Sequence, residues 1–298
     1  MTAISNEDYT RQLLDLITLD RVGDDDFVGS PMPLHLRSVN KRMFGGQVMA
    51  QALIAAEATL PRPRPPASFH CRFVRPGAVD HQIEARISRD IDGKTVSHRR
   101  VEVNQLGKPI FTASIMYHEP TASDVFHQPP MPDVPSGEAC YARMLEQQRA
   151  AAEADSYRSF LYTQPPFLVA PVDPAQWTTA EPADEPCRVW IRIDGRIGDD
   201  PAYHRALLAY ISDTTMLRAC DVRHGLNWFR GELIQASLDH AIWFHDDFRM
   251  DEWLLHCTYS DWAGRGRGLA RGHVFTSDGR LVASTSQEGM VKVVKRPG

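Results

Sequence analysis

Two stretches of the chain are apolar on nearly every side of a helix, which indicates helices surrounded by protein. They are Gln47–Thr59, which follows a Gly-Gly pair, and Tyr203–Leu217. A third stretch, Glu7–Thr18, repeats apolar residues near helical spacing and predicts an amphipathic helix on a larger core, with Asn6 as its cap. Ala139–Ala154 is helix-prone as well.

Between these helices the pattern changes to short runs bounded by turn residues, which is typical of strands. Asp92-Gly93 separates two of the early runs, and Asp278-Gly279 is a hairpin signal before the last one. Asp24–Gly29 is turn-like, and the Pro-rich segment Pro165–Pro186 is expected to be irregular. The predicted strands are Ser68–Arg75, His81–Asp90, Thr95–Gln105, Pro109–His118, Val189–Ile193, Ile234–Phe244, Glu252–Asp261, Gly266–Phe275 and Leu281–Val294.

The same order of elements occurs twice: one buried helix, then four or more strands that pair as neighbours. Gly107–Ser114 is similar to Gly279–Ser284, and Ser68 and Ser237 lie nearly as far apart as the two Ala-Ser pairs that end these segments. A long helix with an antiparallel sheet curled around it is the hotdog architecture, so we expect an α+β, double hotdog fold. We divide the chain into an N-terminal hotdog (1–120), a linker with a helical insert (121–186) and a C-terminal hotdog (187–298) that carries the candidate catalytic residues.

Composition narrows the function classes. A formal net charge of -5 argues against a general nucleic-acid binder. The chain has no run of 18 consecutive apolar residues, so no membrane span is expected. The first residues are polar and acidic, unlike a signal peptide. The five cysteines are scattered and none forms a C-x-x-C pair, which favours reduced thiols in the cytoplasm and no metal cluster. We expect no metal and no cofactor.

Three polar residues fall where the local pattern predicts burial: Asp213 in the second apolar helix, Ser237 in the strand expected over Ile234–Phe244, and Gln287 on the last strand. Asp is a poor residue for a helix interior, so Asp213 either faces a solvated edge or has a specific task. Matching the two halves places Asp213 near Ala56 and Gln287 near Tyr117, whereas a hydroxyl occurs in both halves. We therefore predict one complete site per chain, in the second half.

The chain resembles the acyl-CoA thioesterase II family over roughly Leu13–Met290. The motifs that carry the resemblance are Phe44-Gly-Gly-Gln-Val48, Phe73-Val-Arg-Pro-Gly77, Gly107-Lys-Pro-Ile-Phe111, Leu207-Leu-Ala-Tyr-Ile-Ser-Asp213, Ser237-Leu-Asp-His-Ala-Ile-Trp-Phe-His245, Asp251-Glu-Trp-Leu-Leu255 and Asp278–Gly289. The resemblance implies hydrolysis of fatty acyl-CoA thioesters, with Asp213, Ser237 and Gln287 as the catalytic set. Bacterial members have Thr in place of Ser237; Ser keeps the hydroxyl group.

In the expected mechanism Asp213 accepts a proton from a water that Ser237 and Gln287 hold, although direct attack by Asp213 on the thioester stays open. A backbone N–H near Gly45 or Gly46 would stabilise the oxyanion. We also place Gly45, Gly46, Arg267 and Arg271 among the substrate-binding residues, with the two arginines facing the CoA phosphates.

Two other function classes remain open. An acyl-CoA hydratase or dehydratase on the same fold would favour an Asp-His pair, and a non-catalytic acyl-CoA-binding protein would need no acid in an apolar helix. We expect His70, His240 and His245 to be hydrogen-bonded buried or interface histidines rather than catalytic ones. A homodimer or homotetramer is expected because hotdog sheets commonly pair through their edges. The acyl chain length is not predicted.

Overall fold

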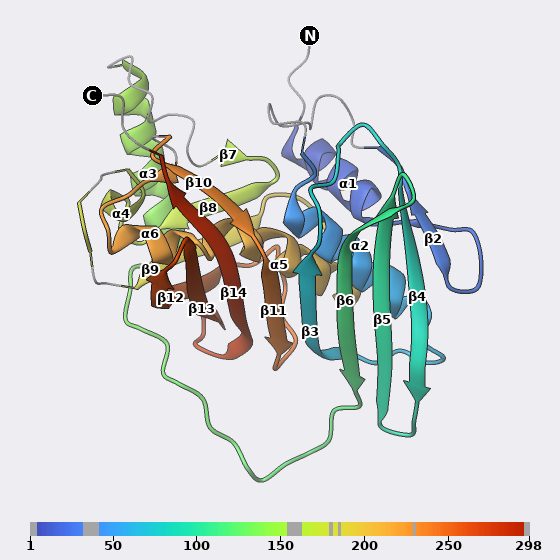
Figure 1. Ribbon diagram of the computed structural model, residues 1–298. Helices are drawn as coiled ribbons and strands as arrows, with labels where there is room; N and C mark the ends of the chain where they lie inside the picture. Colours follow the sequence, from blue (N-terminus) through green and yellow to red (C-terminus); the bar gives the residue numbers. More distant parts are fainter. Residues whose placement is uncertain are drawn as a thin grey trace.

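One continuous antiparallel sheet, with 14 strands in the parts of the chain that the structure describes, runs through both halves. The computed structural model describes residues 5–31, 42–153, 163–178, 181–183, 186–228 and 231–294. The strands are β1 (Asp20–Arg21), β2 (Asp26–Gly29), β3 (Pro66–Phe73), β4 (Ile83–Asp92), β5 (Val96–Gln105), β6 (Lys108–His118), β7 (Thr163–Gln164), β8 (Phe167–Pro171), β9 (Cys187–Ile193), β10 (Leu233–Ser237), β11 (Asp239–Phe244), β12 (Leu254–Gly264), β13 (Arg267–Thr276) and β14 (Leu281–Val293). Their order is β1-β2-β4-β5-β6-β3-β11-β14-β13-β12-β9-β8-β7, with β10 also paired to β14, so that β3 and β11 join the two halves (Figure 1).

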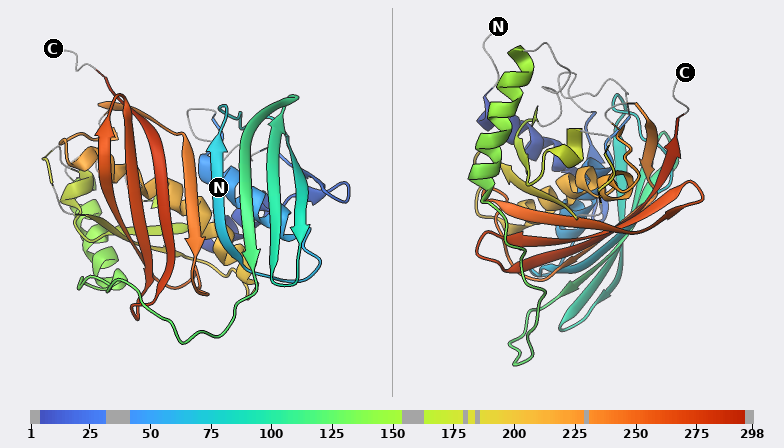
Figure 2. Two further views of the ribbon diagram at one scale, coloured as in Figure 1. Left: turned by 60° about the horizontal axis from the view of Figure 1, so that its bottom comes forward. Right: turned by 90° about the vertical axis from the view of Figure 1, so that its left-hand side faces the viewer.

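Two long helices cover one face of this sheet, which we call the inner face; the opposite side is the outer face. Figure 2, left, shows the sheet in front with both helices, α2 and α5, behind it. The helices are α1 (Asn6–Ile17), α2 (Gly45–Glu57), α3 (Gly137–Glu153), α4 (Ala175–Thr178), α5 (Pro201–Thr215) and α6 (Arg218–Val222).

The burial of β14 shows how the strands distinguish the two faces. Thr285, Gln287 and Gly289 are buried on the inner face, whereas Ser286 and Glu288 between them are partly exposed on the outer face. This alternation is the period of two that a strand imposes on its side chains. A residue directly opposite in a neighbouring strand shares the same face, so the register assigns every site residue to one side of the sheet.

The expected double hotdog is confirmed, because each half wraps antiparallel strands around one long helix. Four local predictions are wrong. The segment expected to be a turn contains β2, which pairs with β4, and the segment expected to be irregular contains β8, which pairs with β9. The strand expected over Ile234–Phe244 is divided at Leu238 into β10 and β11. Asn6 is already helical, and Ser5 caps α1 by accepting a hydrogen bond from the Asp8 backbone N–H.

The two long helices lie side by side and run antiparallel. The start of α2 meets the end of α5, since a Cβ atom on Gly45 would lie 2.7 Å from Asp213 Oδ2. The end of α2 meets the start of α5, since Arg205 forms a 2.8 Å ion pair with Glu57. The two ends of this helix pair therefore differ chemically: one is closed by an ion pair, and the other contains the Asp213 carboxylate.

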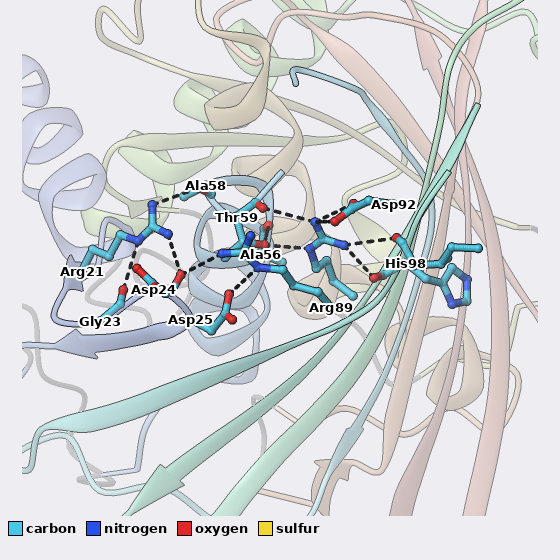
Figure 3. Close-up of polar contacts among 12 residues, drawn as sticks. Arg21, Gly23, Asp24, Asp25, Ala56, Ala58, Thr59, Arg89, Asp92 and His98 are labelled. Carbon is cyan, nitrogen blue, oxygen red and sulfur yellow. Dashed lines mark hydrogen bonds and ion pairs between the residues drawn. The ribbon is translucent and has the colours of Figure 1, made fainter. Parts of the chain in front are cut away.

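The C-terminal end of α2 is fixed by arginine side chains (Figure 3). Arg99 is fully buried and donates to Thr59 Oγ1 at 2.8 Å and to both carboxylate oxygens of Asp92 at 2.8 and 3.0 Å. Arg21 donates to the Ala58 carbonyl oxygen, and Arg89 links the loop before β2 to β4 through Asp25. Cations here satisfy the carbonyl groups that a helix end leaves without partners.

The segment between β6 and α3 contains no helix or strand, as expected for a linker, and passes along one edge of the molecule (Figure 1). It is attached to the β13–β14 hairpin through Gln128, which donates to the Gly279 carbonyl and accepts from the Leu281 N–H. The division into residues 1–120, 121–186 and 187–298 stays a prediction.

Candidate active site

The last turn of α5 carries Asp213. The helix begins with Asp200, whose side chain accepts a hydrogen bond from the Ala202 N–H, followed by Pro201 at its first position. A carboxylate near a helix C-terminus is electrostatically unfavourable, because the carbonyl ends already carry partial negative charge. Asp213 is half-buried at this unfavourable place, so its position points to a local requirement rather than to helix stability.

The structure brings the three predicted catalytic side chains together. Ser237 Oγ donates to Asp213 Oδ1 at 2.7 Å, and Gln287 Nε2 lies 2.9 Å from the same oxygen and 2.7 Å from Ser237 Oγ. The residues come from α5, β10 and β14, and their meeting depends on the pairing of Ser237 with Gly289, which places Ser237 on the inner face. The result is a carboxylate oxygen that accepts two hydrogen bonds while its second oxygen points elsewhere.

The second oxygen, Asp213 Oδ2, faces the start of α2. The Phe44 side chain makes no capping hydrogen bond there, and the first N–H groups of a helix have no partner within the helix. Gly45 keeps this end of α2 close to the carboxylate, because a Cβ atom would meet both Asp213 Oδ2 and, at 2.8 Å, the Phe73 ring. A helix N-terminus so placed can stabilise a negative charge that develops beside Asp213.

Gly46 permits the closest approach of the two helices. A Cβ atom at this position would collide with the carbonyl oxygen of Tyr210 in α5. The Tyr210 ring packs edge-on against Phe44, with ring centroids 5.0 Å apart, and stacks on Phe167 at 5.4 Å. This aromatic contact fixes the start of α2 against the part of α5 that carries Asp213.

A second layer of polar groups lies behind the three side chains. His240 is 1% exposed; its Nδ1 is 2.9 Å from Gln287 Oε1 and its Nε2 is 3.1 Å from Ser212 Oγ. Burial lowers the pKa of His240, although the Asp213 charge acts in the opposite direction. The buried, hydrogen-bonded state expected for this histidine is confirmed, but its contact with Gln287 could not be read from the sequence.

Burial and the Asp213 carboxylate act in the same direction on two neighbouring acids. Burial, reinforced by the negative charge of Asp213, raises the pKa of Tyr210 to about 12. The same two causes raise the pKa of the Cys71 thiol well above its usual range. Both groups are therefore neutral near pH 7.

The two predicted CoA-binding arginines lie on the outer face. Arg267 forms a 2.8 Å ion pair with Glu288, and Arg271 forms a 2.7 Å ion pair with Asp261. Their strand partners on β14 are Met290 and Ser286, which alternate with the inward-facing Gln287. The structure thus does not bring these arginines to Asp213, and a role in binding CoA stays a prediction.

The proposed correspondence between Ser68 and Ser237 is wrong. Ser68 pairs with Met116 on β6. In the repeat Met116 corresponds to Ser286 on β14, and Ser286 pairs with Ala241, so the counterpart of Ser68 is Ala241. Ser237 lies before the break at Leu238 and pairs with Gly289. The first half therefore lacks the hydroxyl as well as the acid, while Ala56 and Tyr117 are fully buried.

In the described parts of the chain, no cluster of three or more His, Cys, Asp or Glu side chains has the arrangement of a metal site. None of the helices in these ranges has the length and apolarity that a membrane span requires.

Two family models match the two halves. The model described as acyl-CoA thioesterase matches residues 174–290, and the model described as acyl-CoA thioesterase N-terminal domain matches residues 33–118. The first match contains all three side chains that meet at Asp213, and the second contains the start of α2.

Full-length comparisons agree with these matches. Human acyl-coenzyme A thioesterase 8 is 32% identical over 286 residues, which cover 93% of this chain and 88% of that protein. The crystal structure of an acyl-CoA thioesterase II from Mycobacterium marinum is 30% identical with a TM-score of 0.76, over 95% of this chain and 99% of that one. A hot dog fold protein of unknown function from Alicyclobacillus acidocaldarius, 20% identical, has a TM-score of 0.75 over 95% and 98% of the two chains and supports the fold alone. Because the chain is 32% identical to human acyl-coenzyme A thioesterase 8 along nearly its whole length, it belongs to the acyl-CoA thioesterase family.

Proposed function

We propose that this protein hydrolyses acyl-CoA thioesters to a free fatty acid and CoA, with a water molecule activated by Asp213, Ser237 and Gln287. The observation that carries the proposal is the half-buried carboxylate that accepts hydrogen bonds from Ser237 and Gln287 and faces the start of α2. Membership of the acyl-CoA thioesterase family supports the substrate class.

Each part of the site has a separate task in this mechanism. Asp213 accepts a proton as the water oxygen forms a bond to the thioester carbonyl carbon, and Ser237 and Gln287 orient that water. The carbonyl oxygen becomes an oxyanion, which the backbone N–H groups at Gly45 and Gly46 stabilise. The carbon–sulfur bond then breaks, and the protonated Asp213 returns its proton to the CoA thiolate.

Direct attack by Asp213 would use the same residues differently. The carboxylate would form an anhydride with the acyl group and expel CoA, and water would hydrolyse the anhydride. A single turnover in ¹⁸O-labelled water tests for the anhydride route. General-base catalysis puts the label in the fatty acid only, whereas an anhydride hydrolysed at the carbonyl carbon of Asp213 leaves the label in the protein.

The proposal is tested by incubating the protein with palmitoyl-CoA and a thiol reagent. Release of free CoA with palmitate is expected; addition of water to the acyl chain would indicate a hydratase, and tight binding without turnover would indicate a binding protein. Ser237→Thr is expected to keep most activity because it keeps the hydroxyl, whereas Ser237→Ala is expected to lose about 10²-fold. Equal losses in both variants would show that packing at this position matters and the hydroxyl does not.

A further inference from the structure

We infer that His240 is a positioning residue that sets the orientation of the Gln287 carboxamide by donating a hydrogen bond from Nδ1 to Oε1. This inference rests on the proposed function, because it assigns a role within the same site. Within the described part of the chain, the His240 ring forms its hydrogen bonds with Gln287 and Ser212 and none with Asp213 or Ser237, so it acts on the site through Gln287.

The hydrogen-bond pattern determines which way the Gln287 amide points. Its outer end lies beside a carboxylate oxygen of Asp213 at 2.9 Å and the Ser237 hydroxyl oxygen at 2.7 Å. Ser237 uses its only hydrogen on Asp213, so it can only accept from Gln287. Both neighbours therefore require the amide NH₂ on this side, and the amide oxygen must face His240.

The tautomer of His240 follows from that orientation. Burial lowers the pKa of His240, so the imidazole is neutral near pH 7 and carries a single N–H. With the Gln287 oxygen 2.9 Å from Nδ1, the hydrogen must be on Nδ1. Nε2 then has a free electron pair. The Ser212 hydroxyl has one hydrogen, which it can donate either to this pair or to the Ala209 carbonyl oxygen, each 3.1 Å from Ser212 Oγ, so the assignment of the tautomer rests on the Gln287 side.

The opposite tautomer would disturb the site. With the hydrogen on Nε2, the electron pair of Nδ1 would face the electron pairs of the Gln287 oxygen. Rotating the amide by half a turn would relieve that contact but would place its oxygen against Asp213 Oδ1. His240 and Gln287 are buried, and the other two groups of the site, Asp213 and Ser237, are half-buried. Water is therefore poorly placed to compensate for either repulsion. His240 thus excludes the rotated amide, in which Gln287 cannot hold a water beside Asp213.

Two substitutions separate this role from simple packing. In His240→Asn the side-chain NH₂ takes the position of Nδ1 and can still donate to Gln287, whereas in His240→Gln the amide reaches the position of Nε2. We expect His240→Asn to keep kcat within about 5-fold and His240→Gln to lower kcat by 10- to 100-fold, with KM little changed in both. Equal loss of kcat in the two variants, or a loss confined to KM, would overturn the inference.

The tautomer itself is measured by ¹⁵N NMR of the wild-type protein labelled at its histidines, with His240→Asn used to assign the signal. We expect the Nδ1 nitrogen of His240 to have the shift of a protonated nitrogen and Nε2 that of an unprotonated one at pH 7. The reverse pattern, or an imidazolium, would overturn the inference. Because this measurement needs no substrate, it distinguishes a wrong His240 assignment from a protein that does not hydrolyse acyl-CoA.

Discussion

Replacing Gly46 with alanine tests whether the contact between α2 and α5 positions the catalytic carboxylate. The added Cβ would collide with the Tyr210 carbonyl oxygen and would lie 2.5 Å from the Phe44 ring. The carbonyl belongs to the α5 backbone and cannot rotate away. The helices must therefore separate by roughly 1.5 Å to restore an ordinary contact between the two atoms.

The expected effect on stability is the difference between two opposing contributions. Overpacking of this kind costs about 1–3 kcal/mol, and replacing a helical glycine with alanine returns about 0.5–1 kcal/mol. We expect a net loss of about 1–2 kcal/mol in the free energy of unfolding, measured by urea denaturation. Asp213 lies one turn beyond Tyr210, and a 1 Å misplacement of a catalytic group can cost about 10²-fold in turnover.

A matched glycine shows whether the effect is specific. Gly93 lies in the β4–β5 turn, where a Cβ would meet only the Val96 carbonyl at 3.2 Å. We expect Gly93→Ala to change stability by less than about 1 kcal/mol and to leave turnover unchanged. A Gly46→Ala variant with normal turnover would refute the link between the helix contact and Asp213, even if its stability fell.

Two further predictions concern buried charges and pH. Arg99→Ala is expected to lower the free energy of unfolding by about 3 kcal/mol because it removes the hydrogen bonds of this buried side chain to Asp92 and Thr59. Removing the exposed Arg100 next to it should cost less than about 1 kcal/mol, and equal losses in urea unfolding would contradict this. Burial, together with the charges of two other histidines, lowers the pKa of His256 from 6.5 to about 3, so only the unfolded chain takes up this proton between those values. The stability that His256 contributes is complete above pH 6.5 and falls by about 2 kcal/mol by pH 5, and this part of the loss should be absent in His256→Asn. If wild type and His256→Asn lost the same free energy of unfolding between pH 7 and pH 5, the role given to His256 would be refuted.

The sequence predicted the parts of the fold that have long and regular patterns. The helix expected over Tyr203–Leu217 is α5, Pro201–Thr215, and the strands with turn residues between them are all present. Short elements were missed because their residues carry no periodic signal. β8 has five consecutive buried residues within a Pro-rich segment, and β2 has only four residues after a run of Asp.

The three groups of the site were predicted, but not the layer that surrounds them. Asp213, Ser237 and Gln287 each stand out as polar residues in apolar surroundings. Their geometry depends on strand register, which the break at Leu238 changes by one residue and which no sequence offset reveals. For the same reason Arg267 could not be assigned to the outer face and His240 could not be connected to Gln287.

The most direct test of the catalytic role of Asp213 is acyl-CoA hydrolysis by Asp213→Asn. Asparagine keeps the size of the side chain and an oxygen that can accept from Ser237, so the variant should stay folded. Loss of the general base should lower kcat by about 10²–10⁴-fold. Asp239→Asn is the matched control, because Asp239 lies at the start of β11 and its carboxylate accepts a hydrogen bond from the Glu288 backbone N–H. The turnover of this variant should stay within about twofold of wild type. A folded Asp213→Asn variant that releases CoA at the wild-type rate would contradict the assignment of Asp213 as the catalytic base.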